Sequence, residues 1–292
     1  MNAKDWFALG SYHQIEGHKV FVIDTSPDND KSLPVLCILH GFPTSSYDYW
    51  KVLPILQQHF RVILHDHLGF GFSDKPKDYS YSFFEQTDIA QTLWQKLNVH
   101  KAYLLAHDYG TSVLTEILAR DNANEFPVAI EKVAVCNGSM HIELAKLLLM
   151  QKLLRSPIGS LIAKFSSKRL MDKNLRKIFV DPTQLYDSEL DSIWFMANYN
   201  QGKNVLAKIS RYTYERKQYW DRWIGALQQT QLPLEIIWPD EDPIAVAKMA
   251  TTIKNETQNS NLTWLNNLGH FPMIEAPDLW ANTVVERLLQ HK

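Results

Sequence analysis

The turn His107–Gly110 follows the apolar run Leu104–Ala106 and precedes a stretch with helical periodicity. This order, a strand followed by a small-x-Asp-x-Gly turn and a helix, is the pattern of a nucleophile elbow with aspartate in place of serine. A carboxylate has an ordinary pKa of about 4, so it is charged at neutral pH and attacks carbon without help from a base. The pattern therefore predicts that Asp108 attacks an electrophilic sp3 carbon, as in an epoxide or a halide-bearing carbon, and forms an ester.

Hydrolysis of such an ester needs a base that takes a proton from water. His270 is the candidate base, because it lies in a loop between the apolar run Leu262–Leu265 and a C-terminal helical pattern. Three acids, Asp240, Glu241 and Asp242, follow another apolar run, and one of them is expected to orient the histidine. The chain order nucleophile, acid, histidine is that of α/β-hydrolases.

The loop His40–Pro43 directly follows the apolar run Val35–Leu39. In a hydrolase of this kind, one backbone N–H of that loop and the N–H after the nucleophile together form an oxyanion hole. The predicted donors are the amides of Phe42 and Tyr109. Their main contribution falls in the second step, when the ester carbonyl becomes tetrahedral.

Six apolar runs have the length of buried strands, and helical patterns separate most of them. The predicted strands are Val35–Leu39, Arg61–Leu64, Ala102–Ala106, Val133–Cys136, Leu234–Trp238 and Leu262–Leu265. The other predicted elements are a hairpin over Phe7–Asp24 and helices over Tyr47–Gln58, Phe83–Leu97, Thr111–Arg120 and from about Ala276 onward. This alternation predicts an α/β fold with a mostly parallel, doubly wound sheet.

The segment from residue 139 to residue 227 interrupts the alternation, because it has helical patterns and no convincing strand. We interpret it as a helical cap inserted between two parts of one core, residues 1–138 and 228–292. An inserted cap shields a pocket from water. The alternative is a second domain without a role at the site.

Composition and charge bound the classes of function. The chain has 292 residues, of which 45% are apolar and 21% are charged, as in an ordinary globular protein. Its formal net charge of −2 predicts no general attraction to nucleic acid or to an anionic membrane, and a small-molecule substrate is the expected partner. The oligomeric state is left open.

Two cysteines, Cys37 and Cys136, lie in apolar runs and are expected to be buried, reduced thiols. The N-terminus lacks the apolar stretch of a secretory signal, and no apolar run approaches the ~20 residues of a membrane span. A cytoplasmic location is therefore expected.

Two short motifs could suggest a metal or a cofactor. The neighbours His65, Asp66 and His67 on one short loop cannot easily converge on one ion, and no distant third ligand accompanies them. The segment Gly69–Asp74 lacks the third glycine and the acidic partner of a dinucleotide fingerprint. No metal and no cofactor are expected.

The chain resembles the branch of the α/β-hydrolases that holds epoxide hydrolases and haloalkane dehalogenases, and within it the subgroup of mesoderm-specific transcript proteins and their bacterial relatives. The matching segments are His40–Ser46, Leu68–Pro76, His107–Gly110, Gly269–His270 and, in the cap, Arg222–Leu227. The resemblance implies the α/β-hydrolase fold over nearly the whole chain. It also implies that Asp242, which precedes Pro-Ile, is the acid of the triad, with Asp240 as the alternative.

The resemblance implies different helper residues for the two reactions. Epoxide hydrolases donate a proton from cap tyrosines, and Tyr212 resembles one such position, with Tyr199 or Tyr214 as its partner. Dehalogenases hold the departing halide with two N–H donors, commonly including a tryptophan after the nucleophile. Tyr109 and Phe42 depart from that pattern, although the cap tryptophans Trp194, Trp220 and Trp223 offer N–H groups. Asn137 matches a position where some dehalogenases carry their acid, and an amide there favours Asp242.

Together these patterns predict a cofactor-free hydrolase that forms an ester on Asp108 and acts on a small, mostly apolar substrate, in the manner of an epoxide hydrolase. The alternatives are a haloalkane or haloacid dehalogenase with the same triad and a non-catalytic binding scaffold. Residues expected to line the pocket are His40, His107, Trp194, Tyr199 and Tyr214.

Overall fold

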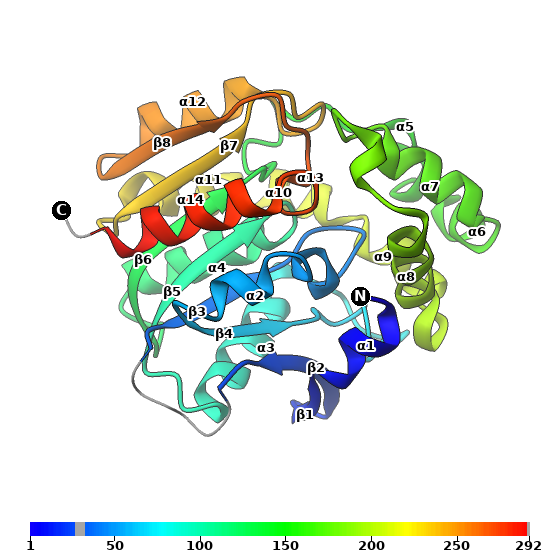
Figure 1. Cartoon of the computed structure of the whole chain (residues 1–292), viewed down its shortest axis with the longest axis horizontal. Coiled ribbons are helices and arrows are strands. Elements are labelled where there is room, and N and C mark those ends of the chain that lie inside the picture. The colour runs from blue at the N-terminus through cyan, green and yellow to red at the C-terminus, as the bar shows by residue number, and fades with distance from the viewer. Residues whose placement is uncertain (27–32, 291–292) are drawn as a thin grey trace.

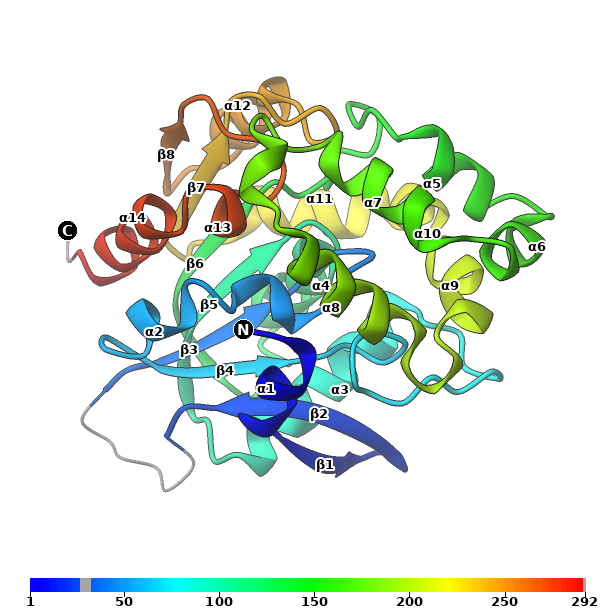
Figure 2. The same ribbon diagram turned by 45° about the vertical axis from the view of Figure 1, so that its right-hand side comes forward.

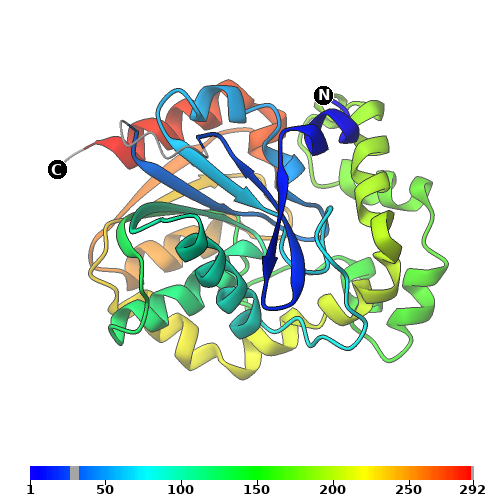
Figure 3. The same cartoon turned by 90° about the horizontal axis from the view of Figure 1, so that it is seen from below.

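The structure is a computed structural model that describes residues 1–26 and 33–290. A twisted sheet runs through the centre of the molecule, and a group of further helices lies beyond one end of its strands (Figure 1). Seen from below, the sheet separates two helical layers, and the further helices stand together at the right-hand side (Figure 3).

The described residues form an eight-stranded sheet in the order β1-β2-β4-β3-β5-β6-β7-β8. The strands are β1 (Ser11–Ile15), β2 (His18–Asp24), β3 (Val35–Leu39), β4 (Arg61–His65), β5 (Lys101–His107), β6 (Ala129–Cys136), β7 (Leu234–Pro239) and β8 (Ser260–Leu265). β2 pairs antiparallel with both β1 and β4, and all other neighbours are parallel. The mostly parallel sheet that the sequence predicts is confirmed.

Helices cover both faces of the sheet. The helices of the core are α1 (Ala3–Ala8), α2 (Leu53–Leu56), α3 (Phe83–Lys96), α4 (Gly110–Asn122), α12 (Ala247–Glu256), α13 (Pro272–Glu275) and α14 (Pro277–Leu289). Helices α2 and α14 pack on one face, whereas α3, α4 and α12 pack on the other. In Figure 1, α2 and α14 lie in front of the sheet and α3 and α4 behind it.

Strand β3 shows why the central strands are apolar throughout. Cys37 and Leu39 are buried with the side chains of α3 and α4, whereas Leu36 and Ile38 are buried with those of α2 and α14. Successive side chains of a strand point to opposite faces, so a strand covered on both faces needs apolar residues at every position. Each such side chain stabilises the fold by roughly 1.5–3 kcal/mol.

The segment between residues 139 and 227 is helical, as predicted. It contains α5 (Leu149–Leu154), α6 (Gly159–Lys164), α7 (Lys168–Arg176), α8 (Asp187–Asn198), α9 (Lys203–Ile209), α10 (Tyr212–Gln218) and most of α11 (Trp220–Gln229). Three short 3₁₀ helices lie outside these elements, at Ser46–Tyr49, Pro182–Gln184 and Tyr199–Gln201. In Figure 2 this segment lies to the right of the sheet, with α6 at the right-hand edge.

The last helix of this segment, α11, packs on the core. Helix α11 packs against α4, where Glu116 accepts hydrogen bonds from Arg222 Nε at 2.7 Å and from Trp223 Nε1 at 2.9 Å. The expected boundary at residue 227 therefore falls inside a helix that is bound to the flank of the sheet. The division into core and cap stays a prediction.

Three local predictions differ from the structure. The N-terminal hairpin is shorter than Phe7–Asp24, because α1 occupies the first residues and its N-cap, Asn2, accepts the N–H groups of Lys4 and Asp5. The helix expected over Tyr47–Gln58 is broken into a 3₁₀ turn and the short α2. Helix α12 was not expected.

The two cysteines, Cys37 and Cys136, are buried and free, which agrees with the sequence. Among residues 1–26 and 33–290, no helix combines the length and the apolar character required to cross a bilayer.

Three histidines are buried together where β3 and β4 end. The ring centroids of His40 and His67 lie 4.4 Å apart, and those of His65 and His67 lie 4.9 Å apart. Burial lowers the pKa of His40 to about 4 and that of His65 to about 3, and it holds the pKa of His67 well below 6.5. All three rings are therefore neutral at pH 7.

These neutral histidines should make the fold sensitive to acid. Because their pKa values are depressed in the folded protein, the stability they contribute is complete above pH 6.5 and is lost as the pH falls toward 4. Each should cost about 1.4 kcal/mol per pH unit in that window. Urea unfolding at a series of pH values should show this slope, and His65→Leu should make it shallower by about one proton.

His100, which is exposed and directly precedes β5, provides the control. His100→Gln should leave the slope as it is. A His65→Leu protein with the slope of the wild type would contradict the proposed origin of the acid sensitivity.

Candidate functional site

Asp108 occupies the sharp bend between β5 and α4. Its φ angle is 43°, in the left-handed region that residues other than glycine rarely adopt. The bend brings the start of α4 so close to β3 that a Cβ atom on Gly110 would lie 2.2 Å from the carbonyl oxygen of Leu39. Glycine is therefore required at this position, and the geometry is that of a nucleophile elbow.

Two groups face the carboxylate of Asp108. The amide N–H of Phe42, from the loop after β3, points to Oδ2 with an N–O distance of 3.4 Å. Nε2 of His270, from the loop after β8, lies 3.5 Å from the same oxygen. Tyr109, which carries the other predicted oxyanion-hole amide, is the residue immediately before α4. The loops that supply these groups all follow the carboxyl ends of parallel strands, so they meet at one edge of the sheet.

Asp242 is the acid that contacts the histidine. Its Oδ2 lies 2.6 Å from Nδ1 of His270 and accepts a hydrogen bond from the side-chain amide of Asn137 at 2.5 Å. Its Oδ1 accepts the N–H groups of Ile244 and Ala245 at 2.7 and 3.0 Å. These contacts fix the carboxylate, which in turn orients the imidazole.

The alternative acid lies elsewhere. Asp240 Oδ1 accepts the N–H of Asn267 at 2.8 Å and stabilises the loop that precedes the histidine. Asn137 occupies the position where some dehalogenases carry their acid, and here its side-chain amide donates a hydrogen bond to Asp242.

The three groups determine one another's charge. Burial alone would raise the pKa of Asp108, but the hydrogen bond and charge of His270 and the charge of Arg216 outweigh it and lower that pKa. Burial alone would lower the pKa of His270, but Asp242 and Asp108 outweigh it and raise that pKa. Burial would raise the pKa of Asp242, yet the charge of His270 lowers it. At neutral pH an imidazolium therefore lies between two carboxylates.

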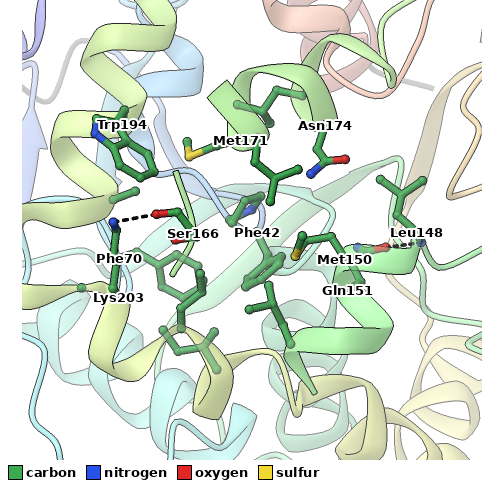
Figure 4. A pocket seen from close by; sticks show the side chains of 18 of the residues that line it. Phe42, Phe70, Leu148, Met150, Gln151, Ser166, Met171, Asn174, Trp194 and Lys203 are labelled. Atoms are coloured by element: carbon green, nitrogen blue, oxygen red, sulfur yellow. Dashed lines mark hydrogen bonds between the residues drawn. The ribbon is translucent and has the colours of Figure 1, made fainter. Parts of the chain in front are cut away.

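A cavity lies next to this triad, between the core and helices α5 to α9. His270 and Phe42 line it at the core side. Figure 4 shows its lining side chains converging from several elements, and most of them are apolar. The apolar lining includes Phe70, Leu148, Met150, Leu154, Met171 and Leu206, and the polar lining includes Gln151, Ser166, Asn174 and Lys203.

The residues predicted to line the pocket are only partly found there. Trp194 lines the cavity. Tyr199 and Tyr214 do not line it, contrary to the prediction. The hydroxyl of Tyr199 lies 3.3 Å from that of Tyr12, and the half-exposed ring of Tyr214 faces the Arg155 guanidinium at 5.0 Å. Tertiary packing of the helical segment places both rings away from the cavity.

His40 and His107 are buried behind the cavity rather than on its wall, which also differs from the prediction. The His107 ring donates a hydrogen bond from Nε2 to the carbonyl oxygen of His270 at 2.8 Å. The His40 ring donates from Nδ1 to the carbonyl oxygen of Gly41 at 2.8 Å. Both rings hold the loops that carry the functional groups.

Tyr212 lies at the start of α10 and is buried. Its ring packs at 5.5 Å from that of Phe42 and at 5.4 Å from that of Tyr109. Burial and the negative charge of Asp108 raise its pKa, so the hydroxyl keeps its proton, although a hydrogen bond with Gln151 acts in the opposite direction. Gln151 lines the cavity, so the hydroxyl stands directly behind the cavity wall.

Arg216 was missed by the sequence analysis. Its side chain is buried, and the guanidinium donates from Nη2 to the main-chain carbonyl of Asp108 at 3.0 Å and from Nε to Ser112 Oγ at 2.5 Å. It also lies 4.6 Å from the ring centroid of Tyr212. The i, i+4 spacing of Tyr212 and Arg216 places both on one face of α10, which was the available signal.

The segment His65–His67 has structural contacts. Asp66 accepts the N–H groups of Ser46 and Phe72 at 2.8 and 2.7 Å. Among the described residues, no group of three His, Cys, Asp or Glu side chains has the arrangement of a metal site.

Comparison with known proteins places the chain in a family. The model of the alpha/beta hydrolase fold matches residues 34–277. The chain is 33% identical over 288 residues to LipZ of Mycobacterium tuberculosis, with 99% of this chain and 98% of LipZ covered. It is 32% identical over 285 residues to the mesoderm-specific transcript protein of Mus musculus, with 93% and 83% covered.

The chain belongs to the α/β-hydrolase family. Among solved structures, the haloalkane dehalogenase DbeA from Bradyrhizobium elkani superimposes with a TM-score of 0.80 and 20% identity over 96% of this chain and 97% of that one. That likeness establishes the shared fold. The resemblance of the sequence motifs to the α/β-hydrolases and to the mesoderm-specific transcript subgroup is confirmed.

Removal of the buried charge behind the elbow should impair turnover. Arg216→Met takes away the hydrogen bond to the Asp108 carbonyl and a positive charge that favours the ionised carboxylate. A hydrogen bond to a charged group contributes about 1.5–3 kcal/mol, so we expect a roughly 10- to 100-fold loss of turnover. The acid limb of the single-turnover rate should move to higher pH, because the pKa of Asp108 rises.

Arg216→Lys, which keeps the charge, should restore the position of the acid limb. The exposed neighbour Arg211 provides the matched control, and Arg211→Met should change neither rate nor profile. A folded Arg216→Met enzyme with the pH profile of the wild type would refute the electrostatic role.

Proposed function

We propose that this hydrolase acts through a covalent alkyl ester on Asp108, in the manner of an epoxide hydrolase. The observation that carries the proposal is the meeting of Asp108, the Phe42 amide and the Asp242-supported His270 at one end of an apolar cavity. An ionised carboxylate is a competent nucleophile for carbon without a base, whereas an ester needs one for hydrolysis.

In the first step, a carboxylate oxygen of Asp108 forms a bond to a ring carbon of the epoxide. The carbon–oxygen bond of the ring breaks, and its electron pair goes to the epoxide oxygen. Tyr212 gives its phenolic proton to this oxygen. A raised pKa keeps that proton on Tyr212 until the more basic alkoxide develops.

In the second step, His270 takes a proton from water, and the water oxygen attacks Cγ of the Asp108 ester. The amides of Phe42 and Tyr109 stabilise the resulting oxyanion. The bond between Cγ and the ester oxygen then breaks, and His270 returns the proton to the departing diol. One oxygen of the regenerated carboxyl group comes from water, and the second proton of that water leaves this group and restores the phenol of Tyr212.

Ester formation itself prepares His270 for this role. In the free enzyme, the charges of Asp242 and Asp108 raise the pKa of His270, so the ring is protonated. Alkylation removes the charge of Asp108 and therefore one of the two causes of the shift. The ring then loses its proton more readily and can act as a base.

Haloalkane dehalogenation is the second candidate, brought by the likeness to DbeA. The Tyr212 ring packs against Phe42 and Tyr109, whereas Tyr199 and Tyr214, the predicted partners of Tyr212, do not line the cavity. Halide binding has weaker support, because only Trp194 of the three candidate tryptophans lines the cavity, whereas the indole N–H groups of Trp220 and Trp223 donate to Glu143 and Glu116. The third candidate is a non-catalytic scaffold, and measurements of turnover on epoxides and halogenated alkanes test it.

The ester should be trapped by a variant that blocks only its hydrolysis. His270→Gln should retain the first step and accumulate a substrate-sized adduct on Asp108, seen by intact mass and peptide mapping after mixing with a reactive aryl epoxide. Asp108→Ala should be folded, inactive and free of adduct. Full activity of Asp108→Ala would refute the nucleophile.

Heavy-oxygen water distinguishes this route from direct attack of water. In a single turnover with excess enzyme, the diol should be unlabelled and Asp108 should carry the heavy oxygen. A panel of chlorinated and brominated alkanes, scored by halide release, tests the second candidate with the same enzyme. Absence of turnover and of adduct with both classes would favour the scaffold.

The two steps should respond differently to pH. Asp108 has a lowered pKa, so the rate of ester formation should be flat across neutral pH. Ester hydrolysis should rise with pH as His270 loses its proton, and the ester should accumulate at low pH. Rapid quenching followed by intact mass measures both rates, and a hydrolysis rate independent of pH would contradict His270 as the base.

A further inference from the structure

The positive and negative charges of the chain are unevenly distributed between residues 139–227 and the rest. Residues 139–227 contain fifteen Lys and Arg against eight Asp and Glu, whereas the rest of the chain contains fifteen against twenty-four. Within residues 146–177 there are nine basic residues and one acid. The whole-chain charge of −2, which predicts no attraction to an anionic surface, therefore does not describe this part of the molecule.

Large apolar side chains are exposed in the same segment. Ile158, Leu161 and Phe165 are 55%, 56% and 74% exposed, and Leu149 is 73% exposed. Ile158, Leu161 and Phe165 follow the i, i+3, i+7 spacing of one helical stripe along α6. Several such residues on one face are unusual for a surface in contact with water alone and indicate an interaction site.

Exposed cations lie in and directly after α6 along the chain. Lys164, Arg169 and Lys173 are exposed, and within the part of the chain that the structure describes none of them is paired with an acid. By contrast, Lys168 and Arg176 pair with acidic side chains. Figures 1 and 2 both show α6 at the right-hand edge of the molecule, away from the sheet.

We propose that this surface binds the headgroup region of an anionic lipid bilayer. We call it the basic cap face; it consists of Leu149, Ile158, Leu161, Lys164, Phe165, Arg169 and Lys173. Exposed Leu and Phe side chains enter the boundary between headgroups and acyl chains, while Lys and Arg attract anionic lipids. Peripheral binding of this kind needs no membrane-spanning helix.

A bilayer fits the basic cap face better than two other occupants. A nucleic acid matches the charge but offers no apolar medium for Ile158, Leu161 and Phe165. A second copy of the chain would bring like charges together, because a two-fold contact places a surface against itself. The bilayer satisfies both the charge and the apolar side chains.

Helix α7, which carries Arg169 and Lys173 of the basic cap face, also forms part of the cavity wall. Met171 and Asn174 of α7 line the cavity, and Leu170 lines it while being 38% exposed. Helix α7 thus has one side toward the cavity and another toward the surface that we propose to contact lipid. A substrate dissolved in the membrane would enter beside α7, so a lipid-soluble electrophile is the favoured substrate class. This inference about the substrate rests on the proposed function, whereas the inference about lipid binding does not.

Vesicle flotation with the full chain tests the docking without any activity. The protein should float with vesicles that contain phosphatidylserine and stay behind with vesicles of phosphatidylcholine alone, and added salt should release it. The triple variant Lys164→Gln, Arg169→Gln, Lys173→Gln should bind about tenfold or more weakly. The triple variant Ile158→Ser, Leu161→Ser, Phe165→Ser should also lose binding.

The matched control removes three exposed lysines outside the helical cap, Lys4, Lys19 and Lys248, by substitution with glutamine. This control should bind like the wild type. All variants should turn over a short, water-soluble substrate normally, because none of these residues lines the cavity.

Absence of flotation with phosphatidylserine vesicles would overturn the proposal. Equal loss in the control variant would do so as well, because it would show that net charge alone matters. A dimer of the wild type that the serine variant dissociates would assign the face to a second copy instead. Loss of turnover in Asp108→Ala with flotation retained separates this proposal from the catalytic one.

Discussion

One buried negative charge, the carboxylate of Asp108, sets the requirements for the structure around it. Removal of a charge from water is costly unless partners replace the lost hydration. Here the partners are the Phe42 amide and the imidazolium of His270, with the guanidinium of Arg216 behind the elbow. Each comes from a different part of the chain, so these contacts to Asp108 form only when the sheet and the helical segment between residues 139 and 227 are folded together.

The same charge links the two chemical steps that we propose. While Asp108 is ionised, it helps to keep His270 protonated, and a protonated ring cannot activate water. Once Asp108 is esterified, its charge is gone and the ring is released to act as a base. Asp242, which keeps its charge throughout, orients the ring in both states. The order of the steps thus follows from electrostatics and requires no movement.

The sequence predicted the core and the triad because both depend on local patterns. A buried parallel strand is apolar at every position, and functional residues directly follow such strands at one edge of the sheet. For this reason Asp108, Asp242 and His270 could be located without coordinates. By contrast, the orientation of the short helices between residues 139 and 227 depends on packing between segments that are distant in the sequence. Tyr199 and Tyr214 were therefore misplaced, and Arg216, whose partner is a main-chain carbonyl, was missed.

The helical segment between residues 139 and 227 has apolar side chains both on its inner side and on its outer surface, and the outer ones need an explanation. A helix with apolar residues on one side normally buries that side and leaves the other polar. In α6, Ala163 is buried, whereas Leu161 and the adjoining Phe165 point outward and are exposed. Packing of α6 against α9 and α5 accounts for the burial of Ala163 and not for the exposed side chains. The exposed Leu161 and Phe165 side chains would be removed from water by an apolar medium outside the protein. The bilayer that we propose supplies this medium, and its anionic lipids match the exposed cations of the same segment.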